Sequence, residues 1–421
     1  MDTMEEDLWH GVTARTFAAL ADAYGTPYYL FDADAVAARV RSIRSSFQSL
    51  VRVYYAVKAN PNLELLRALA GVVDGLDISS AGEMEQALLA GYTPDQLSFA
   101  GPAKTTEELT TSIVRGVGAI SVESEQELRC CVRFAEELAM RAKVVLRVNP
   151  LLRSRWFGMK MGGKPVQFGI DEESMGSALQ ILVNHTDVLD FQGIHVYAGS
   201  QCFDAQGLAE GVKDTLRIAD MIEEATDLTC RKINLGGGFG VSHGERDHEL
   251  DLSAAADSLI PAMRRWHASS GMQRELIFEL GRYLTAEAGI YVARVISQKE
   301  SRGKQYYVLD GGLHHHLAAA GTFGAALRAN FPLQNLSVPA TASRVRCNIA
   351  GPSCNPTDLL GVEVELGSPT PGDLIAVRKS GSYGLSASPL LFLGRTTPAE
   401  LVIRNGSIVL GRTTKSILDF N

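Results

Sequence analysis

The fold of this chain can be inferred from one stretch, Tyr54-Tyr55-Ala56-Val57-Lys58-Ala59-Asn60-Pro61-Asn62. Residues 51–57 are apolar and β-rich, so they predict a strand that delivers Lys58 to its C-terminal end before Asn60-Pro61-Asn62 turns the chain. If this is the first strand of a barrel, Lys58 Nζ points into the mouth where ligands bind. Desolvation there can depress the pKa of the lysine and make it an amine nucleophile toward an aldehyde cofactor. A solvated lysine at a strand end is the alternative.

A repeat of strands and helices continues from this stretch almost to residue 290. Apolar, β-branched runs alternate with amphipathic stretches of helical period. Eight strands alternating with helices predict the α/β class, a closed (β/α)8 TIM barrel with its chemistry at the C-terminal ends of the strands. The runs lie at residues 51–57, 73–78, 97–101, 119–122, 143–148, 191–196, 232–235 and 275–278.

The residues that end these runs test the barrel prediction. Further core residues would contradict it, whereas polar residues and glycines would suit a ligand-binding mouth. The runs in fact end in Lys58, Asp77 with Ser79-Ser80, Lys104, Glu123, Arg147 with Asn149, His195, Gly236-Gly237-Gly238, and Glu279 with Arg282. The agreement favours the barrel more strongly than any single motif does.

Past residue 290 the pattern changes to short β-like runs separated by turn residues, which predicts an all-β domain. We therefore expect three parts. Residues 1–30 form an N-terminal segment that joins the β domain, residues 31–284 form the barrel, and residues 285–421 form the C-terminal β domain.

Composition narrows the class of protein. The chain has 421 residues, 46% of them hydrophobic, and a net charge of −8. An acidic chain without a basic block is a poor candidate for binding nucleic acid. The acidic N-terminus and the short apolar runs predict no signal peptide and no membrane span. The six cysteines form no CxxC motif, so we expect reduced thiols and a cytoplasmic protein.

Two loops at the predicted mouth suit a phosphorylated ligand. Gly236-Gly237-Gly238-Phe239-Gly240 follows the seventh strand, where backbone N–H groups can chelate a phosphate. Glu279-Leu280-Gly281-Arg282 ends the eighth strand. Its carboxylate can keep a pyridine nitrogen protonated, and its arginine can clamp an anion. A flexible turn and a structural Glu–Arg ion pair are the alternatives.

Other residues could complete a site. His195 ends a buried strand, where an imidazole can be a hydrogen-bonded core group or can stack on a cofactor ring, and Ser200 could donate to a phosphate. Cys354 lies in a Gly/Pro-rich loop and can act as a proton donor. Tyr383, in Gly381-Ser382-Tyr383-Gly384, is either a ligand contact or a rim aromatic.

In combination, the motifs resemble one family over nearly the whole chain, the fold-type III pyridoxal-phosphate decarboxylases that include diaminopimelate and ornithine decarboxylases. The motifs are Tyr-Ala-Val-Lys-Ala-Asn at 55–60, His195, Gly-Gly-Gly-Phe-Gly at 236–240, Glu-Leu-Gly-Arg at 279–282, Gly-Pro-Ser-Cys at 351–354 and Gly-Ser-Tyr-Gly at 381–384. The resemblance implies a PLP-dependent carboxy-lyase.

The resemblance also implies roles for individual residues. Lys58 would bind the cofactor aldehyde, His195 would stack on its ring, and Glu279 would pair with its nitrogen. Phosphate contacts would come from Gly236, Gly237, Gly238, Gly281, Arg282, Ser200 and Tyr383, and substrate contacts from Arg282, Arg328, Asn355 and Tyr383. Active sites at a homodimer interface would take Cys354, the proton donor to Cα, and Tyr383 from the partner subunit.

One departure from the family pattern bears on the substrate. The residue after the cysteine is acidic in the diaminopimelate and ornithine enzymes and clamps the distal ammonium of the substrate; here it is Asn355. Burying an ammonium without a counter-charge costs several kcal/mol. A substrate with a free distal ammonium is therefore disfavoured, although Asp358 in the same loop weakens this inference.

Two further segments resemble the subset that decarboxylates an amino acid tethered to an acyl-carrier protein. One contains Arg153, Arg155, Lys160 and Lys164, which could form a basic lip for an acidic carrier or could be an ordinary solvated loop. The other contains His314-His315-His316. Consecutive histidines in a strand point to opposite faces, so we expect no metal.

These features predict a decarboxylase of secondary-metabolite biosynthesis that acts on an amino acid without a free distal ammonium. A diaminopimelate-type decarboxylase of a free amino acid is one alternative. An amino-acid racemase on the same fold is another, and it would need a base on the opposite face of Cα. A non-catalytic homologue is a third, but such proteins typically lose the lysine or the phosphate contacts that this chain retains.

Overall fold

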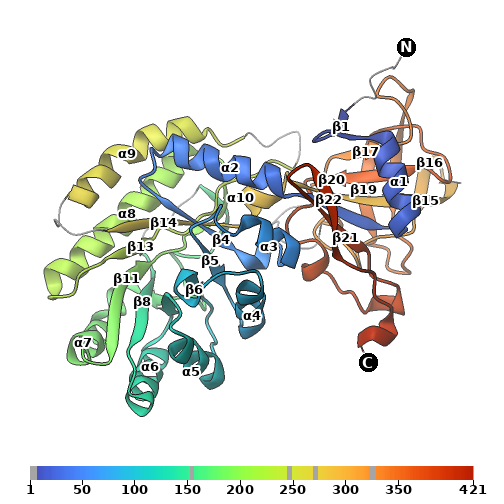
Figure 1. Cartoon of the computed structure of the whole chain (residues 1–421). Coiled ribbons are helices and arrows are strands. Elements are labelled where there is room, and N and C mark those ends of the chain that lie inside the picture. The colour runs from blue at the N-terminus through green and yellow to red at the C-terminus, as the bar shows by residue number, and fades with distance from the viewer. Residues whose placement is uncertain (1–6, 152–155, 244–248, 269–273, 322–328, 421) are drawn as a thin grey trace.

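The structure is a computed structural model that describes residues 7–151, 156–243, 249–268, 274–321 and 329–420. It consists of a barrel surrounded by helices and a β-rich region beside it (Figure 1). The chain starts in the β-rich region, passes through the barrel, and returns.

In the described part of the chain, eight parallel strands close the barrel, as the sequence predicts. Pairing runs in chain order from β4 to β8, continues through β11, β13 and β14, and closes between β14 and β4, where Glu279 is in register with Tyr54. The strands are β4 (Arg52–Ala56), β5 (Gly75–Ile78), β6 (Leu97–Phe99), β7 (Ala119–Val122), β8 (Ala142–Asn149), β11 (Leu189–His195), β13 (Lys232–Asn234) and β14 (Glu275–Leu280).

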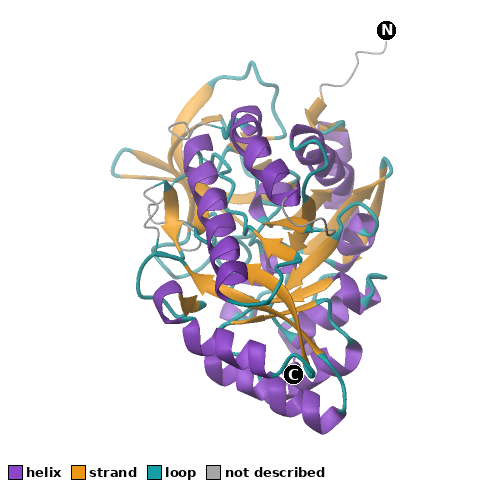
Figure 2. Cartoon of the chain, turned by 90° about the vertical axis from the view of Figure 1, so that its left-hand side faces the viewer, coloured by secondary structure: helices purple, strands orange, loops and turns teal. Residues whose placement is uncertain are grey.

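Helices connect these strands and enclose them (Figure 2). Their starts follow from local sequence: Ser80 accepts a hydrogen bond from Glu83 N before α4, and Thr105 and Glu108 form a capping box before α5. The helices are α2 (Ala33–Ser46), α3 (Leu63–Leu69), α4 (Ala81–Leu89), α5 (Thr106–Arg115), α6 (Glu125–Leu138), α7 (Gly176–Asn184), α8 (Ala205–Ala225), α9 (Leu252–Ala268) and α10 (Arg282–Thr285).

The β-rich region contains strands from both ends of the chain. β3 (Tyr28–Asp32) lies between β15 and β21, antiparallel to the first and parallel to the second. A small β1–β2 hairpin (Asp7–Trp9 and Val12–Thr13) and α1 (Ala14–Tyr24) precede β3. The remaining strands are β15 (Gly289–Ser301), β16 (Lys304–Leu309), β17 (Leu333–Asn335), β18 (Arg344–Ala350), β19 (Leu359–Gly367), β20 (Leu374–Arg378), β21 (Ala399–Arg404) and β22 (Ser407–Arg412).

The histidine triplet differs from the expectation. His314, His315 and His316 do not lie in a strand: His314 and His315 are in a turn that His316 follows, and the His315 and His316 N–H groups both donate to Gly312 O. All three side chains are buried. The argument that successive histidines point to opposite faces of a strand is therefore wrong here.

None of the described helices combines the length and the apolar character needed to span a bilayer. The six cysteines all lie in described residues, and each is a free thiol.

Candidate active site at the barrel mouth

Lys58 is presented by a tight turn directly after β4. Residues Val57–Ala59 form a single 3-10 turn. Tyr55 Oη donates to the backbone oxygen of Asn60, directly after the turn, at 2.9 Å. Asn62 then starts α3 by accepting hydrogen bonds from Glu64 N and Leu65 N. The turn-forming residues of the sequence thus hold the lysine at the C-terminal end of its strand.

Two buried carboxylates hold the Lys58 ammonium. Nζ lies 2.9 Å from Asp77 Oδ2 at the end of β5 and 3.0 Å from Glu279 Oε1 at the end of β14. The side chain of Lys58 is 39% exposed at the mouth, whereas those of Asp77 and Glu279 are 0% and 2% exposed. The cluster forms the floor of the mouth where β14, β4 and β5 lie side by side.

The expected depression of the Lys58 pKa is wrong in this arrangement. Burial lowers the pKa of Lys58, but the charges of Asp77 and Glu279 raise it by more, so it lies well above its usual value. Burial raises the pKa of Glu279, but Lys58 and His195 bring it well below its usual value. The lysine is therefore an ammonium ion in this structure and must lose a proton before it can attack an aldehyde.

His195 is held by a hydrogen bond at Nδ1 and lies close to Glu279 at Nε2. Nδ1 lies 2.9 Å from Ser121 Oγ of β7, and Nε2 lies 3.2 Å from Glu279 Oε2. Burial lowers the pKa of His195, and nearby Arg147 lowers it further against the effect of Glu279, so the imidazole is neutral at pH 7.

The glycine loop after β13 cannot carry side chains. Gly236 and Gly238 have φ angles of 67° and 80°, in the region that favours glycine. A Cβ on Gly237 would lie 2.0 Å from Glu279 O, and one on Gly238 would lie 2.1 Å from Gly199 O. The close approach of Gly238 to Gly199 places Ser200, the next residue, beside the glycine loop.

Arg282 and Tyr383 lie together at the mouth. The Arg282 guanidinium lies 4.8 Å from the centre of the Tyr383 ring, and Tyr383 N donates to Ala59 O at 2.8 Å, beside Lys58. Tyr383 therefore belongs to the mouth of its own chain. The expectation that the partner subunit supplies it is wrong.

Cys354 lies apart from this cluster in the loop after β18. It is exposed, and its loop is tied to the β domain: the carboxylate of buried Asp358 accepts from Leu313 N at 2.7 Å and from Ser353 N at 3.0 Å. Asn355 Oδ1 accepts from the backbone and the hydroxyl of Thr357. No hydrogen bond between described residues joins this loop to Lys58.

Arg328, Arg153 and Arg155 lie outside the described residues.

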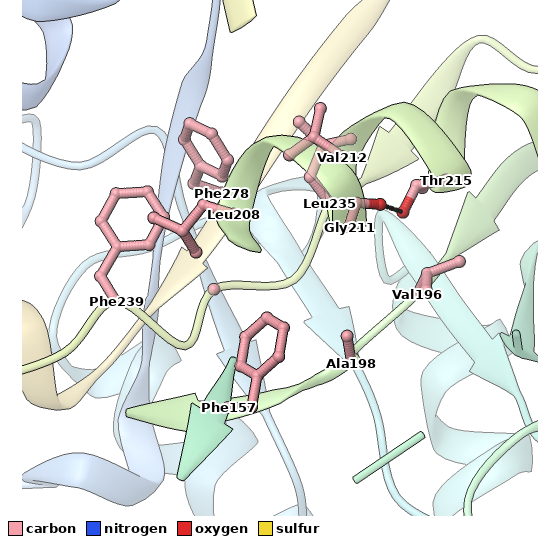
Figure 3. Close-up of a pocket in the computed structure, with 11 residues that line it drawn as sticks. Phe157, Val196, Ala198, Leu208, Gly211, Val212, Thr215, Leu235, Phe239 and Phe278 are labelled. Carbon is pink, nitrogen blue, oxygen red and sulfur yellow. Dashed lines mark hydrogen bonds between the residues drawn. The ribbon is translucent and has the colours of Figure 1, made fainter. Parts of the chain in front are cut away.

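A small apolar cavity lies behind the glycine loop, under α8 (Figure 3). Its volume of about 20 Å³ is room for roughly one water molecule, too little for a substrate. The lining residues are Phe157, Val196, Ala198, Leu208, Gly211, Val212, Thr215, Leu235, Gly237, Phe239 and Phe278.

Sequence reasoning missed several residues that surround this cluster. Asp77 was recognised only as a polar strand end, although that position in a barrel predicts a mouth residue. Asn234 Nδ2 lies 3.3 Å from Glu279 Oε2, and its Oδ1 accepts from Gly236 N. Ser121 and Asn234 belong to strands that read as core, so only the assembled barrel shows their role.

Comparison with known proteins identifies the family. The model of the pyridoxal-dependent decarboxylase family, pyridoxal-binding domain, matches residues 33–286. The chain belongs to this family. As a pyridoxal-dependent decarboxylase, it is a carboxy-lyase that requires pyridoxal phosphate.

Relatives of this decarboxylase cover nearly its whole length. It is 38% identical over 398 residues to the L-glutamyl-[BtrI acyl-carrier protein] decarboxylase of Niallia circulans, which covers 94% of this chain and 92% of that protein. It is 31% identical to the diaminopimelate decarboxylase of Pseudomonas aeruginosa, over 88% of this chain and 86% of that one. The crystal structure of Helicobacter pylori diaminopimelate decarboxylase complexed with L-lysine superimposes with a TM-score of 0.83 at 26% identity, covering 96% of this chain and 98% of that chain.

The residues of this decarboxylase fit the cofactor. The cradle at Gly236–Gly238 has backbone where side chains would clash, as a phosphate site requires. Arg282 supplies a cation near it, and Ser382 Oγ is buried without a hydrogen-bond partner among the described residues. Lys58 and Glu279 follow adjacent strands of the barrel, so an amine and a carboxylate are available for the two ends of the cofactor ring.

Proposed function

We propose that the chain decarboxylates an amino acid that lacks a free distal ammonium and is tethered to an acyl-carrier protein, in secondary-metabolite biosynthesis. The Asn355 loop carries this proposal. Its one acidic residue, Asp358, is buried, and its two oxygens accept from the N–H groups of Leu313 and Ser353, so neither oxygen is free to pair directly with a distal ammonium. Similarity to the glutamyl-carrier-protein decarboxylase supports the tethered substrate.

Bound pyridoxal phosphate supplies a ring that accepts the electron pair left at Cα when CO₂ departs. In our proposal Lys58 binds the aldehyde, Glu279 keeps the ring nitrogen protonated, and His195 contacts the ring face. The groups that hold the phosphate are Gly236, Gly237, Gly238, Gly281, Arg282, Ser200 and Tyr383. Substrate contacts from Arg282, Arg328, Asn355 and Tyr383 remain predictions.

A substrate panel tests the proposal. Free glutamate, lysine and diaminopimelate are compared with glutamate bound to a carrier protein, and CO₂ release is measured. We expect CO₂ from the carrier-bound substrate alone. Rapid release from free lysine or diaminopimelate would contradict the substrate assignment, and exchange of the Cα hydrogen without CO₂ would favour a racemase.

The Asn355→Glu variant sharpens this test by adding the missing counter-charge. We expect a gain in kcat/KM for diaminopimelate of about tenfold or more, since an uncompensated buried ammonium costs several kcal/mol. Thr357→Glu, at an exposed position of the same loop, is the control for added charge.

An exposed lip beside the mouth suits an acidic carrier. The antiparallel pair of strands β9 and β12 (Phe157–Lys160 and Gly199–Cys202) presents Met159, 38% exposed, and Leu151, earlier in the chain, is 57% exposed. Lys160 and Lys164 are exposed and form no ion pair with another described residue. Positive and apolar side chains together match an acidic amphipathic helix.

Charge reversal tests the lip. The double variant Lys160→Glu with Lys164→Glu should raise KM for carrier-bound glutamate at least tenfold and leave kcat/KM for a pantetheine thioester of glutamate unchanged. Lys299→Glu, exposed in the β domain, should leave both unchanged. An equal loss with both substrates would place the effect in the active site itself.

We also propose a homodimer in which Cys354 of one subunit donates a proton to Cα at the mouth of the other. Cys354 is exposed on a loop tied to the β domain, and Leu391, Phe392 and Leu393 expose an apolar patch, 56%, 37% and 47% exposed. Mixing Lys58→Ala and Cys354→Ala proteins should restore about one quarter of wild-type activity. Half of the randomly formed dimers then contain both variants, and each of these has one intact active site of two. No recovery would contradict shared sites.

A further inference from the structure

The cluster at the floor of the mouth has two buried carboxylates for one ammonium. Glu279 accepts from Lys58 Nζ at Oε1 and from Asn234 Nδ2 at Oε2, 3.3 Å away, and His195 Nε2 lies 3.2 Å from Oε2. Asp77 has Lys58 at Oδ2, and its Oδ1 is buried without a hydrogen-bond partner among the described residues. The anionic form is therefore better stabilised on Glu279 than on Asp77.

We propose that Asp77 is a catalytic base that takes protons from Lys58 Nζ when the lysine forms or breaks its bond to the cofactor aldehyde carbon. Asp77 Oδ2 lies 2.9 Å from Nζ, within direct transfer distance. The role differs from that of Glu279, whose charge is needed at the ring nitrogen.

Electrostatics supports this division of roles. Burial raises the pKa of Asp77, and the negative charge of Glu279 raises it further, against the opposing effect of Lys58, so it lies well above its usual value. Glu279 has a pKa well below its usual value. The protons that Lys58 gives up therefore go to Asp77.

Formation of the C=N bond balances in atoms and protons without another reactant. Lys58 Nζ starts as an ammonium and ends in a protonated C=N bond, so it gives up two protons. The aldehyde oxygen gains those two protons and leaves as water. Asp77 Oδ2 carries the protons one at a time and ends ionised, as it began. The reverse sequence frees Lys58 when the substrate amine replaces it.

Uptake of cofactor by the apoprotein tests the proposal separately from turnover and from any choice of substrate. Apoprotein, prepared by dialysis against hydroxylamine, is mixed with pyridoxal 5′-phosphate, and formation of the C=N bond is followed by absorbance. Binding of 4′-deoxypyridoxine 5′-phosphate, which has no aldehyde, reports fit alone. For Asp77→Asn we expect bond formation on the order of 100-fold slower, with unchanged affinity for the analogue.

The controls distinguish a catalytic role of Asp77 from a purely structural one. Asp95→Asn, at an exposed carboxylate that pairs with Lys143, should match wild type in both measurements. A bond-formation rate for Asp77→Asn within twofold of wild type would overturn the proposal. Weaker binding of the analogue in proportion to the slower rate would also overturn it, because Asp77 would then only shape the site.

A second variant guards against misfolding. Asp77→Ala, checked by circular dichroism, leaves a space that formate can enter. We expect formate to restore bond formation at least tenfold in Asp77→Ala and to have no effect on wild type. Absence of rescue in an Asp77→Ala protein that still binds the analogue tightly would overturn the proposal.

Discussion

The Lys58 ammonium and the Glu279 carboxylate lie 3.0 Å apart although 221 positions separate them in the sequence. They meet because β4 and β14, the first and last barrel strands, pair side by side with Glu279 in register with Tyr54. Closure of the barrel therefore creates the site: neither residue has this partner until the last strand is in place.

Glu279→Gln should reduce kcat on the order of 100-fold, the usual effect of removing one preorganised electrostatic contact to developing charge. A neutral amide cannot hold the ring nitrogen of the cofactor protonated. Steady-state CO₂ release measures the effect. Glu275→Gln, at the opposite end of the same strand, is the matched control and should match wild type.

Ser121→Ala should weaken pyridoxal phosphate binding roughly fivefold, for a loss of about 1 kcal/mol. The hydroxyl lies 2.9 Å from His195 Nδ1 and, by donating there, keeps the hydrogen on Nε2. Equilibrium dialysis gives the affinity, and ¹⁵N spectra of His195 report the tautomer. Ser112→Ala, whose hydroxyl donates to Glu108 O on α5, should change neither; a wild-type tautomer in Ser121→Ala would refute this role.

The barrel could be predicted from sequence because each strand ends in a residue type that a core would not tolerate. Lys58, Asp77, Glu123 and Glu279 all follow apolar runs, and a common C-terminal rim is the simplest arrangement that explains them. The pKa of Lys58 could not be predicted in the same way. Its direction depends on the two carboxylates that the closed barrel brings within 3.0 Å, and sequence spacing does not give such distances.

Gly211→Ala should stabilise the protein by about 0.5–1 kcal/mol. Gly211 lies inside α8 beside the small cavity of Figure 3, and a Cβ there would meet no atom within 4 Å. Thermal unfolding measures the gain, and activity should not change. Gly237→Ala is the opposite case, because its Cβ would lie 2.0 Å from Glu279 O, and it should lower both stability and cofactor affinity.

Asp74→Asn should destabilise the protein at pH 7 by about 1–2 kcal/mol. Oδ2 of Asp74 accepts from Arg44 and from Val53 N, and Oδ1 accepts from Arg52. Burial raises the pKa of Asp74, but Arg44 and the Val53 N–H lower it by more, so the net shift is downward.

The sign of this shift fixes the pH dependence. A carboxylate whose pKa is lowered by folding contributes stability above its unfolded pKa, near 4, and loses it as pH falls through the folded value. In urea unfolding, the difference in free energy of unfolding between wild type and Asp74→Asn should therefore shrink below about pH 4. A difference that stays constant down to pH 2 would contradict the ionic origin. Asp22→Asn, exposed on α1, is the control at each pH.

The β domain shows where sequence reasoning failed. Strand β15, 13 residues long, does not follow from a short β-like run, because it pairs with several neighbours and changes from buried to exposed along its length. The expectation that a partner subunit supplies Tyr383 was also wrong. A loop that returns from the β domain to its own barrel leaves no periodic signal in the sequence.

The position of β3 between β15 and β21 has a consequence for synthesis on the ribosome. Tyr28 is in register with Ala399, so the early strand emerges roughly 370 residues before its parallel neighbour exists. At a translation rate of about 5–20 residues per second, the apolar side chains of β3 stay unpaired with β21 for on the order of 20–70 seconds. A chaperone that shields nascent chains should therefore bind the segment that contains β3 and release it only when β21 has emerged.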